Sequence, residues 1–591
     1  MKAIMKKWTS VLLTAALAIS LAACSAPTVT TGTAPTTSES AAAANAPNYG
    51  GKLVSYHSEF YNDYDPNAST MKNYVSFFTD MLWNIDWETD RTKFNFSSAY
   101  IDTNYLSGQL ANEWKIADDL KSMTVKINDN VYFQDKTAAG LDAKYDIYKG
   151  RQLKAIDVKY TYDRLLGLDG VAQQALEMTN WPGTLSMVDS VEVVDDLTVK
   201  FNFKTSDQLS IDSFMCAFVS ICGPEWDALT AEQKSDWHYA AGTGPFILTD
   251  YSGDNSMTFT KNSKYFAKDA DGNQLPYLDQ VQLVYMTDTA TVLSSFLSGD
   301  LNAIVANSEI LNKDQADQLK ASLKAEEYKA YSYYGKPIGV GFKQGTNPVP
   351  ALADIKVREA MQYAIDAKAI SEYFGYKYDS VDQMICGVFA NGTAWNNLDG
   401  WGDDLVASYT TYDVEKAKQL LADAGYADGF SFDVTLFQMM PVEAFQLAAE
   451  YLAKVGITMN VNVVPTPNEM TAVGGDANNP GSMFASYGID NMQFFSMAIP
   501  YDGPMNSIKQ NNPQIDTLAQ TVLKSTNAAD QTVAAQKLDQ AFMADHYLMM
   551  VTYSEQATNW YSSSVMGLNG EKPSQNYYFG YMFARAWLAD K

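Results

Sequence analysis

The stretch that decides the fold runs from Phe430 to Val464, with the sequence FSFDVTLFQMMPVEAFQLAAEYLAKVGITMNVNVV. Apolar residues alternate at both ends and recur every three or four positions in the middle, which indicates a strand, a helix and a second strand. The apolar positions are Phe432, Val434 and Leu436, then Ala444, Leu447, Ala448, Tyr451, Leu452 and Val455, and then Ile457, Met459, Val461 and Val463. Two strands joined through a helix form a βαβ unit, which implies a partly parallel sheet. The sequence therefore predicts an α/β fold.

Two further helices are predicted upstream of this unit. In 354–370 the apolar residues Val357, Met361 and Ala364 share one helical face. In 413–426 the same spacing recurs between Asp413, a candidate N-cap, and Gly425, a candidate stop.

The first half of the chain contains two candidate β-hairpins. In 123–133 apolar residues alternate on both sides of the polar turn Asn128-Asp129-Asn130. In 191–203 they alternate on both sides of Asp195-Asp196. Between these hairpins, Asp157 is placed to cap a helix.

The N-terminus has the pattern of an export signal. Three lysines precede an apolar run, Val11 to Ala23, that is too short to span a bilayer as a stable helix. The run ends in LAAC, which resembles a bacterial lipobox, so that 1–23 would be removed and Cys24 lipidated. The alternative is an ordinary secretory signal cut after Ala23, with a cysteine there by chance. The Ala/Thr/Ser/Pro tract 24–48 is expected to be a flexible tether.

Composition excludes some classes of partner. Removal of 1–23 takes away three lysines and no acid, which leaves 39 basic against 69 acidic residues and a net charge of −30. Such a surface does not favour nucleic acid, which requires basic patches. No other stretch approaches the length of a membrane-spanning helix.

Cysteine and histidine usage argues against a disulfide framework, a metal centre or a catalytic triad. Beyond Cys24 the cysteines are Cys216, Cys222 and Cys386, and we expect Cys216 and Cys222 to be buried thiols. No histidine lies at a metal-ligand spacing from another histidine or cysteine, and no known metal, phosphate or hydrolase motif occurs. We therefore predict no catalytic residues, no metal and no cofactor.

Several segments, taken in order, resemble the bacterial extracellular solute-binding proteins of family 5, the oligopeptide- and dipeptide-binding lipoproteins of ABC importers. Each segment is a weak signal alone, but together they span most of the mature chain. They are LANEWKIADDLKSMTVKINDNVYFQD (110–135), LKAIDVKYTYDRL (153–165), GTGPFILTDY (242–251), LPYLDQV (275–281), LSGDLNAI (297–304), DIKVREAMQYAID (354–366) and YDVEKAKQLLADAGYADGF (412–430).

The resemblance implies a periplasmic-binding-protein-like clamp of type II, in which two lobes close on a ligand by hinge motion. Lobe one would comprise 49–329, with an extra subdomain at about 91–187, and would be rejoined by 551–591. Lobe two would comprise 330–550, and the crossings between the lobes would form the hinge.

The resemblance also implies a ligand site. In the peptide binders of the family, an aspartate preceded by an aromatic residue pairs with the α-ammonium of the ligand. This pattern falls on Tyr487, Gly488 and Asp490, with tyrosine in place of the usual tryptophan. No lysine or arginine lies between Lys454 and Lys509, so a ligand carboxylate would have to be met elsewhere. This departure weakens a di- or tripeptide assignment and leaves longer peptides or a neutral ligand open.

Other ligands and one other class of protein compete with the peptide interpretation. Trp395 and Trp401, among Asn and Asp residues, could stack on sugar rings in an oligosaccharide-binding relative, or could be packing residues of a surface loop. Nickel or haem is less favoured, because no histidine is evidently placed for either. A secreted glycoside hydrolase using two carboxylates is a remote alternative.

The expected function is that of a non-catalytic, monomeric receptor. It would be anchored outside the cytoplasm through lipidated Cys24 and would capture oligopeptides for an ABC permease.

Overall fold

The computed structural model describes most of the chain between residues 47 and 589. The described residues are 47–57, 64–67, 73–91, 96, 105–171, 185, 187–204, 206, 208–217, 219–253, 255–305, 311, 313–344, 349–378, 380–389, 395–437, 441–465, 469, 482–485, 495, 499–500, 506, 508–510, 512–525, 528–571 and 579–589. Cys24 and residues 24–46 of the predicted tether therefore lie outside the described residues.

A ten-stranded mixed sheet has the order β14-β13-β15-β12-β16-β11-β1-β10-β9-β8. Its strands are β1 Lys52–His57, β8 Phe246–Tyr251, β9 Ser256–Lys261, β10 Gln280–Tyr285, β11 Ala303–Ile304, β12 Tyr328–Gly341, β13 Phe430–Phe437, β14 Ile457–Val464, β15 Ser482–Ala485 and β16 Leu548–Ser562.

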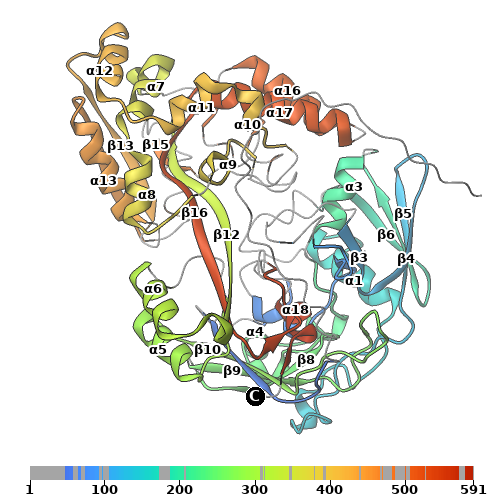
Figure 1. Ribbon diagram of the computed structural model, residues 1–591. Coiled ribbons are helices and arrows are strands. Elements are labelled where there is room, and N and C mark those ends of the chain that lie inside the picture. The colour runs from blue at the N-terminus through green and yellow to red at the C-terminus, as the bar shows by residue number, and fades with distance from the viewer. Residues whose placement is uncertain are drawn as a thin grey trace, which may run out of the picture. The chain divides into compact units, whose positions relative to one another are not determined.

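The two longest strands, β12 and β16, form one antiparallel pair that runs through the middle of this sheet (Figure 1). The pairing extends from Tyr328 opposite Ser562 to Gly341 opposite Leu548. Its register shifts twice, on either side of Pro337. Because proline has no N–H to donate to a strand pair, the pairing is weakened near Pro337.

The segment 430–464 forms the predicted βαβ unit. Strands β13 and β14 pair in parallel from Phe430 opposite Ile457 to Phe437 opposite Val464, and α13 (Val442–Ala453) connects them. The other two predicted helices are also present, as α7 (Ile355–Ala364) and α12 (Val414–Asp423). As predicted, the Asp413 side chain caps α12 by accepting a hydrogen bond from the Lys416 N–H. The α/β prediction is confirmed.

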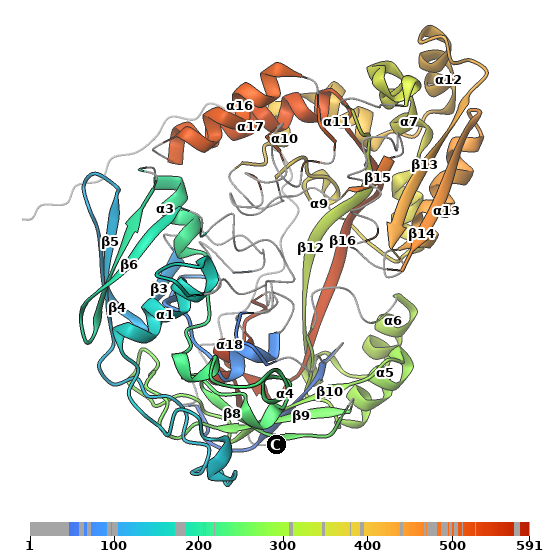
Figure 2. The same cartoon turned by 180° about the vertical axis from the view of Figure 1, so that it is seen from behind.

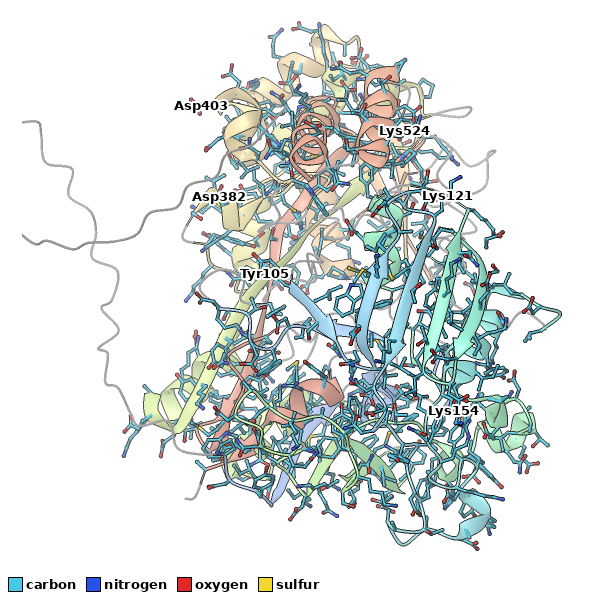
Figure 3. All side chains as sticks on the ribbon, turned by 90° about the vertical axis from the view of Figure 1, so that its right-hand side faces the viewer. Tyr105, Lys121, Lys154, Asp382, Asp403 and Lys524 are labelled. Carbon is cyan, nitrogen blue, oxygen red and sulfur yellow. The ribbon has the colours of Figure 1, made fainter. Side chains whose placement is uncertain are left out.

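A separate four-stranded antiparallel sheet has the order β4-β5-β7-β6, with Lys121 and Lys154 at its opposite ends (Figure 3). Its strands are β4 Ala111–Ile116, β5 Ser122–Ile127, β6 Val188–Asp195 and β7 Thr198–Phe203. The sheet therefore extends beyond residue 187, where the extra subdomain was expected to end.

Only one of the two predicted hairpins in this region is correct. Strands β6 and β7 form the hairpin predicted around Asp195. The hairpin predicted for 123–133 is wrong, because β5 pairs with β4 and β7 instead. Residues 131–133 bond to a neighbouring loop, through Leu153 N–H to the Val131 carbonyl and Phe133 N–H to the Arg151 carbonyl.

Helices cover the sheets, and α16 and α17 pack against each other (Figure 2). Two further strand pairs are β2 Trp83–Ile85 with β3 Leu106–Gly108, and β17 Val565–Met566 with β18 Trp587–Leu588. The remaining helices are α1 Ala155–Leu166, α3 Gln208–Met215, α4 Ala231–Lys234, α5 Thr289–Ser298, α6 Lys313–Ser322, α8 Ala367–Tyr373, α9 Val381–Met384, α10 Leu398–Trp401, α11 Asp403–Thr410, α16 Pro513–Lys524, α17 Ala528–Ala544 and α18 Phe579–Arg585. Short 3-10 helices, such as Asn73–Phe77, connect several of them.

The described residues form two main hydrophobic cores. The first core gathers residues between Leu53 and Val305 and is completed by residues from Tyr561 to Ala586, including those of α18. The second core gathers residues between Ile338 and Tyr553. Strands β12 and β16 contribute side chains to both hydrophobic cores, so this strand pair joins the two cores.

Asp157 caps α1 as predicted, from the third position of the helix rather than from the N-cap position itself. Its carboxylate accepts from the N–H of the N-cap residue Lys154 and from Arg151. Only glycine fits at position 244, because the backbone of Phe78 and Thr79 lies too close for a side chain. A Cβ there would lie 2.5 Å from the Phe78 carbonyl carbon and 2.6 Å from the Thr79 nitrogen.

Each core contains a buried carboxyl group that forms no ion pair among the described residues. Asp80 accepts from Thr243 Oγ1 at 2.8 Å and Tyr265 OH at 3.0 Å. Asp539 accepts from the Val388 N–H at 2.6 Å and Trp401 Nε1 at 2.9 Å. Burial raises the pKa of Asp80 and of Asp539 to about 7, because hydrogen bonds only partly replace lost hydration.

Replacing Gly244 by alanine is expected to lower the free energy of unfolding by about 3 kcal/mol, because the new methyl group overlaps backbone atoms that cannot move aside. Gly140→Ala is the control. Gly140, unlike Gly244, has a positive φ, +85°, which strains an alanine there, but nothing lies within 4 Å of its Cβ position, so we expect a loss of only about 1 kcal/mol. Urea unfolding of both variants measures the difference, and equal losses would contradict the close-approach explanation.

The buried carboxyls predict a fall in stability with rising pH. Because their pKa values are raised above the unfolded value, the stability they contribute is complete below about pH 4 and is lost as pH rises through 7. Between pH 5 and pH 8 each carboxyl should cost about 2 kcal/mol of unfolding free energy. Asp539→Asn, which cannot ionise, should flatten this decline in urea titrations at the two pH values. An unchanged decline would show that Asp539 does not titrate in this range.

Candidate functional site

The predicted ligand contacts Tyr487, Gly488 and Asp490 lie outside the described residues. The described residues on either side of them are fixed in the fold. Strand β15 ends at Ala485, which pairs with Gly339 of β12. Phe495 is fully buried in the second core, and its ring stacks on Phe389 at 5.3 Å between centroids. The assignment of Asp490 and its two neighbours stays a prediction.

Trp395 and Trp401 are described, and both lie in the second core. They are 5% and 4% exposed, and their rings contact Phe389 and Tyr409 respectively. The indole N–H of Trp401 donates to Asp539. In this structure both side chains therefore have packing roles, while their contact with a sugar stays a prediction.

Asp539 is a positioning residue that was not recognised in the sequence. It lies on α17, and Oδ1 accepts from the backbone N–H groups of Val388 and Phe389 while Oδ2 accepts from Trp401. A Cβ on Gly387 would lie 2.2 Å from Oδ1, so the loop passes directly over the carboxyl. Asp539 thus holds the loop that supports Phe389, which in turn stacks on Phe495. No local signal in the sequence could have linked residues this far apart.

The irregular middle of the β12 and β16 pair is supported from one side by the segment that follows α8. The Tyr378 hydroxyl donates to the Ser554 carbonyl at 2.6 Å, and Ser554 is the residue opposite Pro337. The Lys377 N–H donates to Gln556 Oε1 at 3.0 Å. These contacts attach the middle of β16, at Ser554 and Gln556, to a segment that packs on the second core.

The described part of the first core contains one polar cavity of interest, beside Asp80. It has a volume of about 10 Å³, which is room for about one water molecule, and is lined by Ser76, Thr79, Asp80, Met81, Asn84, Gln109, Ser220 and Tyr581. The Gln109 amide bridges this group, since Nε2 donates to Asp80 while Oε1 accepts from the Met81 N–H and from Asn84. The lining side chains are mostly hydrogen-bonded to each other, which suits the binding of water.

Among the residues that the structure describes, no group of three or more His, Cys, Asp or Glu side chains could hold a metal ion. No described helix is both long and apolar enough to cross a membrane.

Comparison with known proteins identifies relatives of this chain. It is 26% identical to heme-binding protein A of Haemophilus influenzae over 367 residues, which cover 59% of this chain and 60% of that protein. It is 28% identical to di/tripeptide-binding protein 1 of Pseudomonas aeruginosa over 382 residues, which cover 61% of this chain and 63% of that protein. The matches thus span less than two thirds of the length of these relatives.

Solved structures share the fold over nearly the whole chain. A putative peptide binding protein AppA from Clostridium difficile matches with a TM-score of 0.69 at 16% identity, covering 91% of this chain and 100% of that one. The oligopeptide-binding protein AppA from Bacillus subtilis, in complex with a nonapeptide, matches with a TM-score of 0.64 at 17% identity, covering 92% and 100%. The predicted clamp fold is confirmed. Because residues 106–507, more than half of the sequence, match the middle region of the bacterial extracellular solute-binding proteins of family 5, the chain belongs to that family.

Proposed function

We propose that this protein captures a peptide-like solute outside the cytoplasm and delivers it to the permease of an ABC importer. The observation that carries the proposal is the family match over residues 106–507. Relatives named for binding dipeptides and tripeptides support a peptide as the solute. The receptor acts as a monomer, and no chemical change of the solute is required.

The proposed location follows from the N-terminal sequence. The signal 1–23 directs export, and lipid attachment at Cys24 keeps the protein at the membrane surface. The tract 24–48 then gives the receptor enough reach to meet a permease in the same membrane.

The ligand is held between the lobes, with its α-ammonium at Asp490 and with Tyr487 and Gly488 beside it. A carboxylate that pairs with an ammonium away from water makes a strong, charge-assisted hydrogen bond. Bonding to the ligand's backbone would leave its side chains in roomy pockets and permit many sequences.

An oligosaccharide is the competing solute. Similar folds occur in complexes with agropinic acid and mannopinic acid, so the fold is not restricted to peptides. However, the two tryptophans that would stack on sugar rings are buried against Phe389 and Tyr409 in this structure, which favours the peptide.

Asp490→Ala is expected to weaken the binding of alanine peptides of three to five residues by about ten-fold, because one charge-assisted hydrogen bond is lost. Isothermal titration calorimetry on ligand-stripped protein measures the change. Asp428→Ala, which removes an exposed acid of the second lobe region, is the matched control and should bind as the wild type does. Unchanged affinity in Asp490→Ala would contradict the assignment of the ammonium to Asp490.

A receptor leaves a glycan intact, whereas a glycoside hydrolase cleaves it. We expect no new reducing ends when the purified protein is incubated with xylan, cellulose and starch fragments. Release of reducing ends in proportion to the concentration of this protein would contradict the receptor proposal.

A further inference from the structure

The cavity beside Asp80 lies where four separate parts of the chain meet in the first core. Its lining comes from the segment 76–84, from Gln109, from Ser220 and from Tyr581 of α18. Helix α18 packs directly on the 3-10 helix Asn73–Phe77. The Gly580 N–H donates to Ser76 Oγ at 2.9 Å, and a Cβ on Gly580 would lie 1.9 Å from the Ser76 carbonyl oxygen. The cavity is therefore at the joint that attaches the C-terminal helix to the first core.

Among the described residues, every side chain that bonds to Asp80 donates a hydrogen to it. Oδ1 accepts from Gln109 Nε2 and from the Tyr265 hydroxyl, and Oδ2 accepts from Thr243 Oγ1. An ionised carboxylate can accept about four hydrogen bonds, whereas a protonated one must also donate its O–H. While these three side chains donate, they leave one position open on the ionised carboxylate and offer no acceptor to the protonated one.

Both forms of Asp80 occur near neutral pH. Burial raises the pKa of Asp80 to about 7, although the hydrogen bonds from Thr243 and Tyr265 and the positive charge of Arg585 lower it. The other titratable groups that face this site keep their charge in this range. Burial raises the pKa of the Tyr265 and Tyr581 hydroxyls above the ordinary value, and arginine side chains stay charged in proteins. A partner of Asp80 in the cavity therefore has to bond to both forms of the carboxyl.

Two further residues that border the cavity can bond to a molecule inside it. Thr79 Oγ1 donates its hydrogen to a backbone carbonyl at 3.0 Å, so the 3.0 Å contact between Thr79 Oγ1 and Ser220 Oγ is donated by Ser220. The lone pairs of Ser220 Oγ can then accept. Asn84 Nδ2 donates one hydrogen to Gln109 Oε1 at 3.1 Å, which leaves its second hydrogen to donate. With Asp80 these are three partners, the number that an internal water usually has.

We propose that one permanent water molecule is bound in this cavity by Asp80, Ser220 and Asn84, and that it bonds to Asp80 in both protonation states of the carboxyl. The cavity has a volume of about 10 Å³, which is close to the smallest space that holds a water. The water donates to Ser220 Oγ and accepts from Asn84 Nδ2. It donates its second hydrogen to the ionised carboxylate, and it accepts from the O–H of the protonated one. Asp80 can therefore exchange a proton with solvent without losing this bond, and the joint with α18 is kept.

High-resolution crystal structures of the purified protein at about pH 5 and about pH 8, where a different form of the carboxyl prevails at each pH, test the inference directly. We expect one density peak at the same place in both structures, with contacts of about 2.6 to 3.2 Å to the Asp80 carboxyl, Ser220 Oγ and Asn84 Nδ2. Absence of the peak at either pH would overturn the inference. Contacts shorter than about 2.5 Å from several oxygens would also overturn it, because they indicate a metal cation.

Ser220→Val tests the role of the water in solution. Valine fills the cavity and removes the acceptor, so we expect the backbone amides of α18 to exchange with deuterium about ten-fold faster than in the wild type. Asp80→Asn, whose amide group both donates and accepts, should keep the water in its crystal structure. Ser371→Val is the matched control, because Ser371 is also a buried serine but accepts from the Tyr553 N–H at 2.8 Å in the second core.

The control variant is expected to leave the exchange of α18 unchanged. Equal acceleration of α18 exchange in Ser220→Val and Ser371→Val, or wild-type exchange in Ser220→Val, would overturn the role given to the water. Ser220→Ala, which removes only the acceptor, replaces the valine variant if that variant does not fold, and it should change α18 exchange in the same direction. The wild-type crystal structures test the presence of the water without any substitution.

Discussion

The antiparallel pairing of β12 with β16 is the constraint on which the rest of the structure depends. It brings together Tyr328 and Ser562, residues separated by most of the second half of the chain. At one end of the pair, Trp560 and Tyr561 are buried with residues of the first half of the sequence. At the other end, Val340 and Met550 are buried in the second core. The residues between β12 and β16 in the sequence can therefore fold as one region, which is connected to the first region through these two strands.

The same pairing is irregular around Pro337. Hydrogen-bonded register is lost on both sides of Pro337, while the flanking parts of β12 stay paired to β16. A short irregular segment between two well-packed parts can absorb backbone rotation without disturbing either core. The contacts of Tyr378 with Ser554 and of Lys377 with Gln556 attach the middle of β16 to a segment of the second core.

Local sequence patterns predicted the regular parts of the second core well. The parallel strands β13 and β14, the helices α7 and α12, and the Asp413 cap follow from periodicity and capping chemistry within short windows. The same reasoning failed at 123–133. The alternation correctly indicated a strand, but the strand predicted to pair with it was wrong. Strand β5 pairs with β4 and β7, because burial between two neighbours outweighs a local turn.

The long-range polar contacts could not be predicted from the sequence. Asp539 bonds to Val388 and Trp401 across more than a hundred positions of the chain. The two tryptophans predicted as sugar contacts illustrate the same limit, since their pattern in sequence is equally consistent with the buried positions they occupy. Family resemblance, by contrast, is carried by ordered segments along the chain, and the match over 106–507 confirms it.

The most direct test of the central claim is to identify what the protein carries when it is isolated. Native mass spectrometry of the chain without residues 1–24, purified without denaturation, followed by denaturing release and sequencing of the bound molecules, gives this answer in one experiment. The account predicts a set of small peptides bound one per protein chain. Masses spaced by hexose units would contradict the peptide assignment while keeping the receptor role, and a covalently altered solute would contradict capture without chemistry.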